Sequence, residues 1–252
     1  MTVYGLYARE TGGWMSVSRL ISLLGDLDVD EPAVRSSISR LKRRGMLEPV
    51  RTDVAGYQLS TEAEAVLREG DERIFRRDRA TLADGWLLAV FSVPESERNK
   101  RHTLRTQLTR LGFGTTAPGV WTAPAHLRES TENMLRRFDL AGYADLFHSR
   151  HLAFGDLADK VRQWWDLDQL DRLYDDFIRA NAQKRRKPPS DRTAFVDYVR
   201  LLTDWRRLPY LDPGLPKELL PARWSGIRAA DTFFTLQAQW QELARRHAVT
   251  TS

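Results

Sequence analysis

The chain has 252 residues and a formal net charge of +5, with 42% hydrophobic and 29% charged residues, a composition typical of a globular protein of two or three domains. It contains no cysteine, which excludes disulfides, thiolate metal ligands and cysteine nucleophiles. No apolar run reaches the roughly 20 residues of a membrane span, and Met1–Arg9 does not have the pattern of a leader peptide, so we expect a cytoplasmic protein without membrane contact.

Residues 1–70 have the pattern of a winged helix-turn-helix domain. Apolar residues spaced along one helical face predict three short helices, over residues 3–12, 17–25 and 31–44. Asp30 is the expected N-cap of the third helix and Gly45 ends it. Met46–Arg51 and Tyr57–Leu59 then predict a hairpin around a polar turn, and a further helix begins after Ser60.

The third helix carries the chemistry expected of a DNA-reading helix. Between residues 35 and 51 there are six basic side chains and one acid, Glu48, whereas over residues 1–70 as a whole basic and acidic side chains nearly cancel. Arginine can bind guanine bidentately and serine can bond base edges or phosphate, while further cations outside the groove hold phosphates. The candidate DNA-binding residues are Arg35, Ser36, Ser39, Arg40, Lys42, Arg43, Arg44 and Arg51. Two other interpretations are a solvated arginine face without a ligand, and a small helical domain that binds protein.

Residues 71–84 read as a helical linker, and residues 85–150 as a second domain. A continuous apolar run from Trp86 predicts a buried central strand that ends at Pro94. Further strands are predicted at residues 113–116, 120–122 and 144–147, and helices at residues 98–111 and 127–138. This βαββαβ order predicts a ferredoxin-like sandwich.

Residues 151–252 read as a helical domain with four apolar stripes. The basic tract Lys184–Pro189 separates two helices and is predicted to be an exposed loop. Prolines recur between Arg206 and Gly226, so this stretch cannot form one regular helix. It is either a structural strap or the lining of an effector pocket. Nothing in the sequence forms a catalytic arrangement, and His148 and His151 lack further metal-ligating neighbours, so we expect no enzyme activity, no metal site and no cofactor.

Several stretches resemble the phenylacetic-acid degradation repressor (PaaX) family. In the N-terminal part they are Ala33–Leu41, Arg44–Gly45 and Tyr57–Ser60. In the middle they are Gly85–Trp86, Ser92–Glu95, Leu111–Gly114 and Gly119–Trp121. In the C-terminal part they are Arg206–Pro209, Asp212–Pro216, Leu219–Pro221 and Trp224–Gly226. One departure is the wing, where the family has a basic turn and this chain has Thr52–Gly56 with Asp53 inside it.

The resemblance implies an α+β protein with an N-terminal winged helix-turn-helix, a Cas2-like central domain that dimerises, and a helical effector domain. It implies a homodimeric repressor of aromatic-acid (phenylacetate) catabolism that binds double-stranded operator DNA. A small effector such as an aryl-acetyl coenzyme A thioester would release it from the DNA. Arg206 or Arg207 would then hold an anionic group of the effector, and Trp224 would offer an aromatic wall.

Two other classes of function stay open from the sequence. A Cas2-like nuclease needs clustered carboxylates to hold a metal ion, but the first central strand ends in Ser92-Val93, and Glu95 lies beyond Pro94. The other alternative is a protein-interaction module that uses the helical C-terminal part and does not bind DNA.

Overall fold

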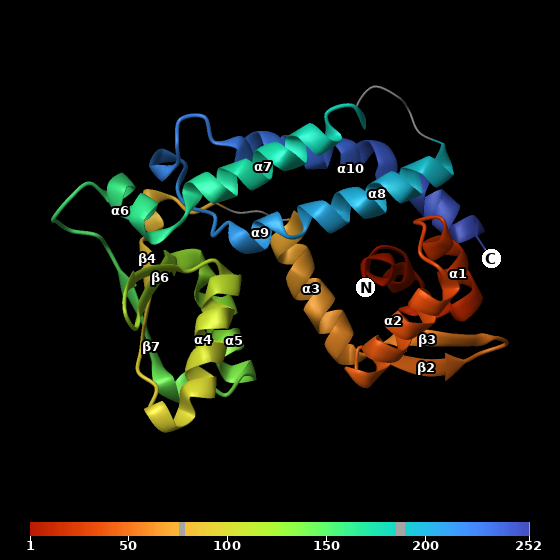
Figure 1. The fold of residues 1–252 in the computed structure, drawn as a ribbon, viewed down its shortest axis with the longest axis horizontal. Helices are drawn as coiled ribbons and strands as arrows, with labels where there is room; N and C mark the ends of the chain where they lie inside the picture. Colours follow the sequence, from red (N-terminus) through yellow and green to blue (C-terminus); the bar gives the residue numbers. More distant parts are fainter. Residues whose placement is uncertain (76–78, 185–189, 252) are drawn as a thin grey trace. The chain divides into compact units, whose positions relative to one another are not determined.

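The computed structural model describes residues 1–75, 79–184 and 190–251 (Figure 1). These residues form two compact units, each discontinuous in sequence. The first unit is made of the described parts of residues 1–76, 177–205 and 229–252, and the second of those of 77–176 and 206–228. Residues 151–252, which the sequence suggested as one helical domain, therefore contribute to both units.

The first unit begins with the elements of a winged helix-turn-helix. A π-helical turn at Tyr4–Ala8 and a 3-10 turn at Arg9–Thr11 replace the predicted first helix. The elements that follow are β1 (Trp14–Ser16), α1 (Val17–Gly25), α2 (Glu31–Arg43), β2 (Leu47–Arg51), β3 (Ala55–Leu59) and α3 (Thr61–Phe75). The three strands form one antiparallel sheet in the order β1-β3-β2. Sequence reasoning missed β1, because three residues are too few to show an alternating pattern.

Helices from the far end of the chain complete the core of the first unit. They are α8 (Asp191–Trp205) and the part of α10 (Ser225–Thr250) from Ala229 onward. Phe195 of α8 packs against Tyr7 with ring centroids 5.4 Å apart, and Trp205 stacks on Phe233 of α10 at 4.8 Å. Aromatic pairs at such separations add to the stabilisation from their buried area. The N-terminal winged helix-turn-helix elements and the C-terminal helices thus share one hydrophobic core.

The second unit contains the predicted βαββαβ domain. Its elements are β4 (Trp86–Phe91), α4 (Arg98–Leu111), β5 (Gly114–Ala117), β6 (Val120–Pro124), α5 (Arg128–Arg137) and β7 (Ala144–Ser149). The antiparallel sheet has the order β5-β6-β4-β7, which is that of a ferredoxin-like sandwich and puts the apolar strand β4 inside the sheet as predicted. α4 and α5 lie side by side on one face (Figure 1). Leu87, Leu104 and Trp121 are buried between the sheet and these helices.

The proline-rich stretch is fastened inside the second unit, which also contains α6 (Leu157–Trp164), α9 (Leu208–Leu211) and the described start of α7 (Leu167–Asn181). Asp212 is buried and accepts hydrogen bonds from the Tyr174 hydroxyl at 2.8 Å and from Arg79 at 3.3 Å. Its other oxygen accepts from the backbone N–H of Gly214 at 2.8 Å. A buried carboxylate with this many donors holds the extended backbone in place, which is what the strap interpretation requires.

Two sequence predictions concern residues on which the structure is silent. Residues 185–189 of the predicted basic loop and residues 76–78 of the predicted linker lie outside the described residues. Within the described residues, no helix combines the length and the apolar character that a membrane crossing demands.

Candidate nucleic-acid interface

Helix α2 presents the predicted DNA-binding side chains on its outer surface. Asp30 caps its N-terminus, because its side chain accepts from the backbone N–H of Ala33 at 2.8 Å, as the sequence indicated. Val34 and Ile38 are almost fully buried and fix which face of the helix turns inward. The opposite face is therefore free to meet a ligand.

All eight candidate DNA-binding residues are exposed. They are Arg35, Ser36, Ser39, Arg40, Lys42, Arg43 and Arg44 on or just after α2, and Arg51 at the end of β2. Arg35 forms an ion pair with Glu31 at 2.7 Å, and Arg40 donates to the Ser37 hydroxyl at 3.1 Å. Both contacts lie at the surface, where such pairs contribute little free energy and can be exchanged for contacts to DNA.

The β2–β3 hairpin stands beside α2 as the predicted wing. Its register pairs Leu47 with Leu59 and Arg51 with Ala55, so residues 52–54 form the tip and Asp53 is exposed there. Trp14 of β1 packs over the hairpin and donates its indole N–H to the carbonyl of Val50 at 3.3 Å. Strand β1 therefore supports the wing.

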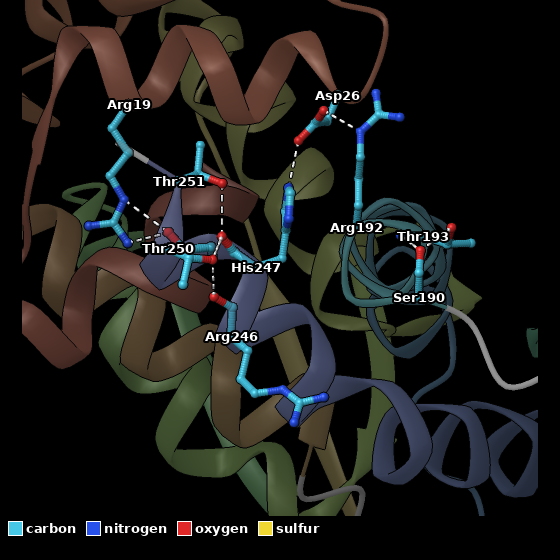
Figure 2. Close-up of polar contacts among 10 residues, drawn as sticks. Arg19, Asp26, Ser190, Arg192, Thr193, Arg246, His247, Thr250 and Thr251 are labelled. Atoms are coloured by element: carbon cyan, nitrogen blue, oxygen red, sulfur yellow. Dashed lines mark hydrogen bonds and ion pairs between the residues drawn. The ribbon is translucent and has the colours of Figure 1, made fainter.

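Helix α1, which precedes α2, is tied to the C-terminal helices of the same unit. Figure 2 shows Asp26, just after α1, pointing at both Arg192 of α8 and His247 of α10. Arg192 Nε donates to Asp26 Oδ1 at 2.6 Å, and His247 Nε2 lies 2.7 Å from Oδ2. At the start of α1, Arg19 Nε donates to the carbonyl of Ala248 at 3.0 Å. We call these contacts of Asp26 and Arg19 the α1 clamp.

The α1 clamp sets the electrostatics of Asp26. Burial opposes ionisation of its carboxyl group, but the hydrogen bonds and charges of His247 and Arg192 together outweigh burial and hold the pKa below its ordinary value. A second contact nearby, Arg200 with Asp28 at 2.9 Å, is far more exposed. Asp26 is therefore the acid through which α1 is joined to α8 and α10.

The predicted effector residues fall in different surroundings. Arg206 and Arg207 are exposed, whereas Trp224 is buried and packs edge-on against Tyr174. Trp224 lines a cavity of 690 Å³ whose walls include neither Arg206 nor Arg207. The cations in that wall are Lys217, Arg223 and Arg228. The sequence motif predicted that Arg206 and Arg207 lie beside Trp224. In the structure α9 and the proline-rich stretch separate the two arginines from Trp224 along the chain, and neither arginine lines the cavity.

The carboxylate and histidine candidates for catalysis have structural contacts. Glu95 accepts from Arg101 at 2.8 Å, and His148 Nε2 lies 2.7 Å from the carbonyl of Asp84. Among the described residues, no three His, Asp or Glu side chains are grouped so that they could hold a metal ion. Glu95 is therefore part of no such group among the described residues.

Sequence reasoning missed the supports of this surface. Trp14 and the α1 clamp both depend on pairs far apart in the chain, such as Asp26 and Arg192, which are 166 residues apart. No local spacing signals such a pair.

Comparison with known proteins covers nearly the whole chain. Three family models match it: PaaX-like protein over residues 1–63, the PaaX protein central Cas2-like domain over residues 79–161, and the PaaX-like protein C-terminal domain over residues 165–250. The transcriptional repressor PaaX of Escherichia coli (strain K12) is 27% identical over 241 residues, which span 90% of this chain and 75% of that protein.

A solved structure has a similar fold over nearly its whole length. It is the uncharacterized protein Rv0674 from Mycobacterium tuberculosis, 26% identical, with a TM-score of 0.66 over 98% of this chain and 97% of that one. The family models match in chain order, and their three segments correspond to the winged helix elements, the ferredoxin-like sheet and the C-terminal helices described above. The chain therefore belongs to the PaaX family.

Proposed function

We propose that the protein is a transcriptional repressor that binds operator DNA through α2 and the wing. The observation that carries this proposal is the outer face of α2, where arginines and serines are exposed on a helix whose inner face is fixed by Val34 and Ile38. A helix of this kind fits the major groove, and the cations around it can hold phosphates. The Escherichia coli relative, named a transcriptional repressor, supports the same function.

The finer features of the proposal follow the family resemblance. The protein would act in the cytoplasm as a homodimer, with its two α2 helices in successive major grooves of a palindromic operator, about 34 Å apart. Its operon would serve catabolism of an aromatic acid such as phenylacetate. An effector such as an aryl-acetyl coenzyme A thioester would release the DNA by binding more tightly to a dimer in which the two helices are out of register.

The α1 clamp suggests how an effector bound to C-terminal elements can reach the DNA. Because α1 and α2 share a core with α8 and α10, a shift of those helices displaces the helix pair that reads DNA. Differential binding to two such arrangements is sufficient for release.

For the effector we propose the cavity beside Trp224. It combines an aromatic and aliphatic wall, made by Trp224, Leu220 and Ile227, with Lys217, Arg223 and Arg228. Such a wall suits a ligand with an aryl group and an anionic group. Arg206 and Arg207 remain candidates for the anionic group only if they move toward this cavity.

A salt-dependent binding assay tests the repressor function. The full-length protein is titrated into labelled DNA from upstream of its own gene and into scrambled DNA of equal length. Tight binding to the upstream DNA alone, weakening steeply with salt, is the expected result. Equal and weak binding to both DNAs would contradict recognition of this operator.

A second assay tests the effector. Aryl-acetyl coenzyme A thioesters are titrated into the protein–operator complex, and we expect DNA release that is weakened in Arg223→Ala. Weakening in Arg206→Ala instead would assign the anionic group to the position that the sequence motif suggested. No release and no heat of binding would exclude this class of effector.

A further inference from the structure

The central domain carries a strongly basic helix that the proposed function does not use. Helix α4 has five cations, Arg98, Lys100, Arg101, Arg105 and Arg110, and no acidic residue. Helix α5 on the same face of the sheet, by contrast, mixes three arginines with Glu129 and Glu132. The absence of acids on α4 concentrates positive charge on one element of the second unit.

The cations of α4 form a stripe along its outer surface. Leu104, Leu108 and Leu111 are buried against the sheet, which fixes the inward face. Arg98, Arg101 and Arg105 follow one another at intervals of three and four residues and so lie along one side of the helix. At 1.5 Å per residue, the stripe from Arg98 to Arg105 is about 10 Å long.

Two adjoining hollows follow this stripe. One has a volume of 520 Å³ and the other 490 Å³, and both are lined by Arg101, Arg105 and Trp121. The first extends to the β5–β6 hairpin, at the edge of the sheet, and adds the hydroxyls of Ser92 and Thr115. Neither lining contains an acidic residue. The surface therefore offers cations and hydroxyl donors to an elongated anion.

The pairing of these cations differs along the helix. Arg101 is held in place by Glu95 at 2.8 Å and by the carbonyl of Val93 at 2.6 Å. Arg98 and Arg105 are exposed, and no ion pair or hydrogen bond joins either side chain to another described residue. Lys100 is also paired, with Asp139 at 3.0 Å, so Arg98 and Arg105 are the exposed cations of the stripe whose charge no ion pair with a described residue offsets. An anion that lies along the stripe is attracted to both.

We propose that α4 binds the phosphate backbone of duplex DNA through Arg98 and Arg105, as a second contact independent of base sequence. The stripe is elongated and open along its length, which suits a linear polyanion better than a single small anion. Cations and hydroxyls without a base-reading arrangement are the groups that hold phosphates and fix register. This inference rests on the proposed function in one respect only, namely that the protein binds DNA.

The test compares the full-length protein with the double variant Arg98→Ala/Arg105→Ala. Fluorescence anisotropy measures binding to operator and to scrambled DNA over a series of salt concentrations. Losing two phosphate contacts should lower the slope of log K against log salt by about two and weaken binding at 0.1 M salt on the order of ten- to a hundredfold. Both DNAs should be affected equally, so that the preference for the operator stays the same.

A matched control removes the same charge elsewhere in the second unit. Arg162→Ala/Arg172→Ala takes two exposed arginines from α6 and α7, and should leave the salt slope unchanged. Circular dichroism and thermal unfolding show that both variants are folded; because the changed side chains are exposed, we expect them to be.

Several outcomes would overturn the inference. One is an unchanged slope in the α4 variant, and another is an equal fall in the control. If the α4 variant changed the oligomeric state and left the salt slope unchanged, we would conclude that this face is a protein interface. A failure of the proposed operator recognition can be distinguished from a failure of the α4 contact, because the salt slope on scrambled DNA still reports the α4 contact. Absence of binding to any DNA would contradict the α4 contact itself.

Discussion

Helices α2 and α4 are both short, basic and exposed on one side, yet they are built into their units differently. α2 begins at an acid-capped N-terminus and buries only Val34 and Ile38. It is flanked by the wing and carries Ser36 and Ser39 among its arginines. α4 buries three leucines against a sheet and lies beside α5. We therefore expect α4 to contact phosphates only, and α2, with its serines and the wing beside it, to read sequence as well.

The largest expected effect comes from truncating the reading face of α2. Arg40→Ala/Arg43→Ala removes two cations from the exposed face. Because a good arginine–guanine contact contributes about 1–3 kcal/mol, the loss of two should lower operator affinity at least about thirtyfold. Anisotropy with operator and scrambled DNA should show their affinities converging. If the α4 variant lost operator preference while this α2 variant kept it, the roles assigned to the two helices would be reversed.

The next prediction concerns the support of the wing. A Cβ on Gly56 would lie 2.5 Å from the Trp14 ring, so Gly56→Ala should lower the free energy of unfolding by about 1–3 kcal/mol through overpacking. It should also weaken operator binding, because the wing must shift. Thermal unfolding and anisotropy, both on the full-length protein, measure these two effects.

The second unit offers a matched control for this steric change. In Gly114→Ala the new Cβ would lie 2.7 Å from the Trp165 ring and 2.8 Å from the carbonyl of Trp164. A similar loss of stability is expected, but folded protein should keep its preference for the operator. Loss of that preference in Gly114→Ala alone would mean that the central sheet, and not the wing, determines recognition.

The two units also differ in what the sequence could predict. The bounds of α4 follow from Leu104, Leu108 and Leu111 at helical spacing and from Gly112, which ends the helix in the left-handed region with φ 87°. The N-cap of α2 by Asp30 is equally local. Such features lie within one or two helical turns, so the sequence predicted the helices and hairpin from residue 17 to the start of α3, and the ferredoxin-like order of the second unit.

The contacts that join distant segments could not be predicted. Asp26 reads as one of several acids before α2, and only the fold brings it to Arg192 and His247. Likewise, Arg206 and Trp224 lie in one sequence motif, but only Trp224 lines the cavity. A motif gives the order of residues along the chain and does not show which of them lie close together in the fold. The candidate DNA-binding side chains could be named from the sequence because a single helix carries nearly all of them.

The α1 clamp gives a smaller and pH-dependent effect. Asp26→Asn keeps the size of the side chain but weakens two charge-assisted contacts, so unfolding should become easier by about 1–2 kcal/mol at neutral pH. Because the pKa of Asp26 is lowered in the folded protein, its stabilisation is fully present above the unfolded value near 3.9 and is lost as pH falls through the folded value. Denaturant titrations at pH 7 and below pH 4 should show the difference between wild type and variant shrinking in acid.

Asp28→Asn is the control for the clamp. Asp28 contacts Arg200 at the surface, and its φ of 64° is one that asparagine adopts readily. We expect less than about 0.5 kcal/mol of change. A larger loss in Asp28→Asn than in Asp26→Asn would place the connection between α1 and the C-terminal helices at Arg200 instead.

The smallest effect is expected at the wing tip, where Asp53 lies exposed beside the cations of the interface. An acid there repels phosphates, so Asp53→Asn should raise DNA affinity by a few tenths of a kcal/mol, roughly twofold at low salt. The gain should fall as salt is raised, because exposed charges are screened. Anisotropy at 0.05 M and 0.5 M salt measures it, with Asp145→Asn on exposed β7 of the central sheet as a control of equal charge. An equal gain from both substitutions would assign the effect to net charge; a gain confined to Asp53→Asn would place the wing tip, like α2, within reach of the DNA backbone.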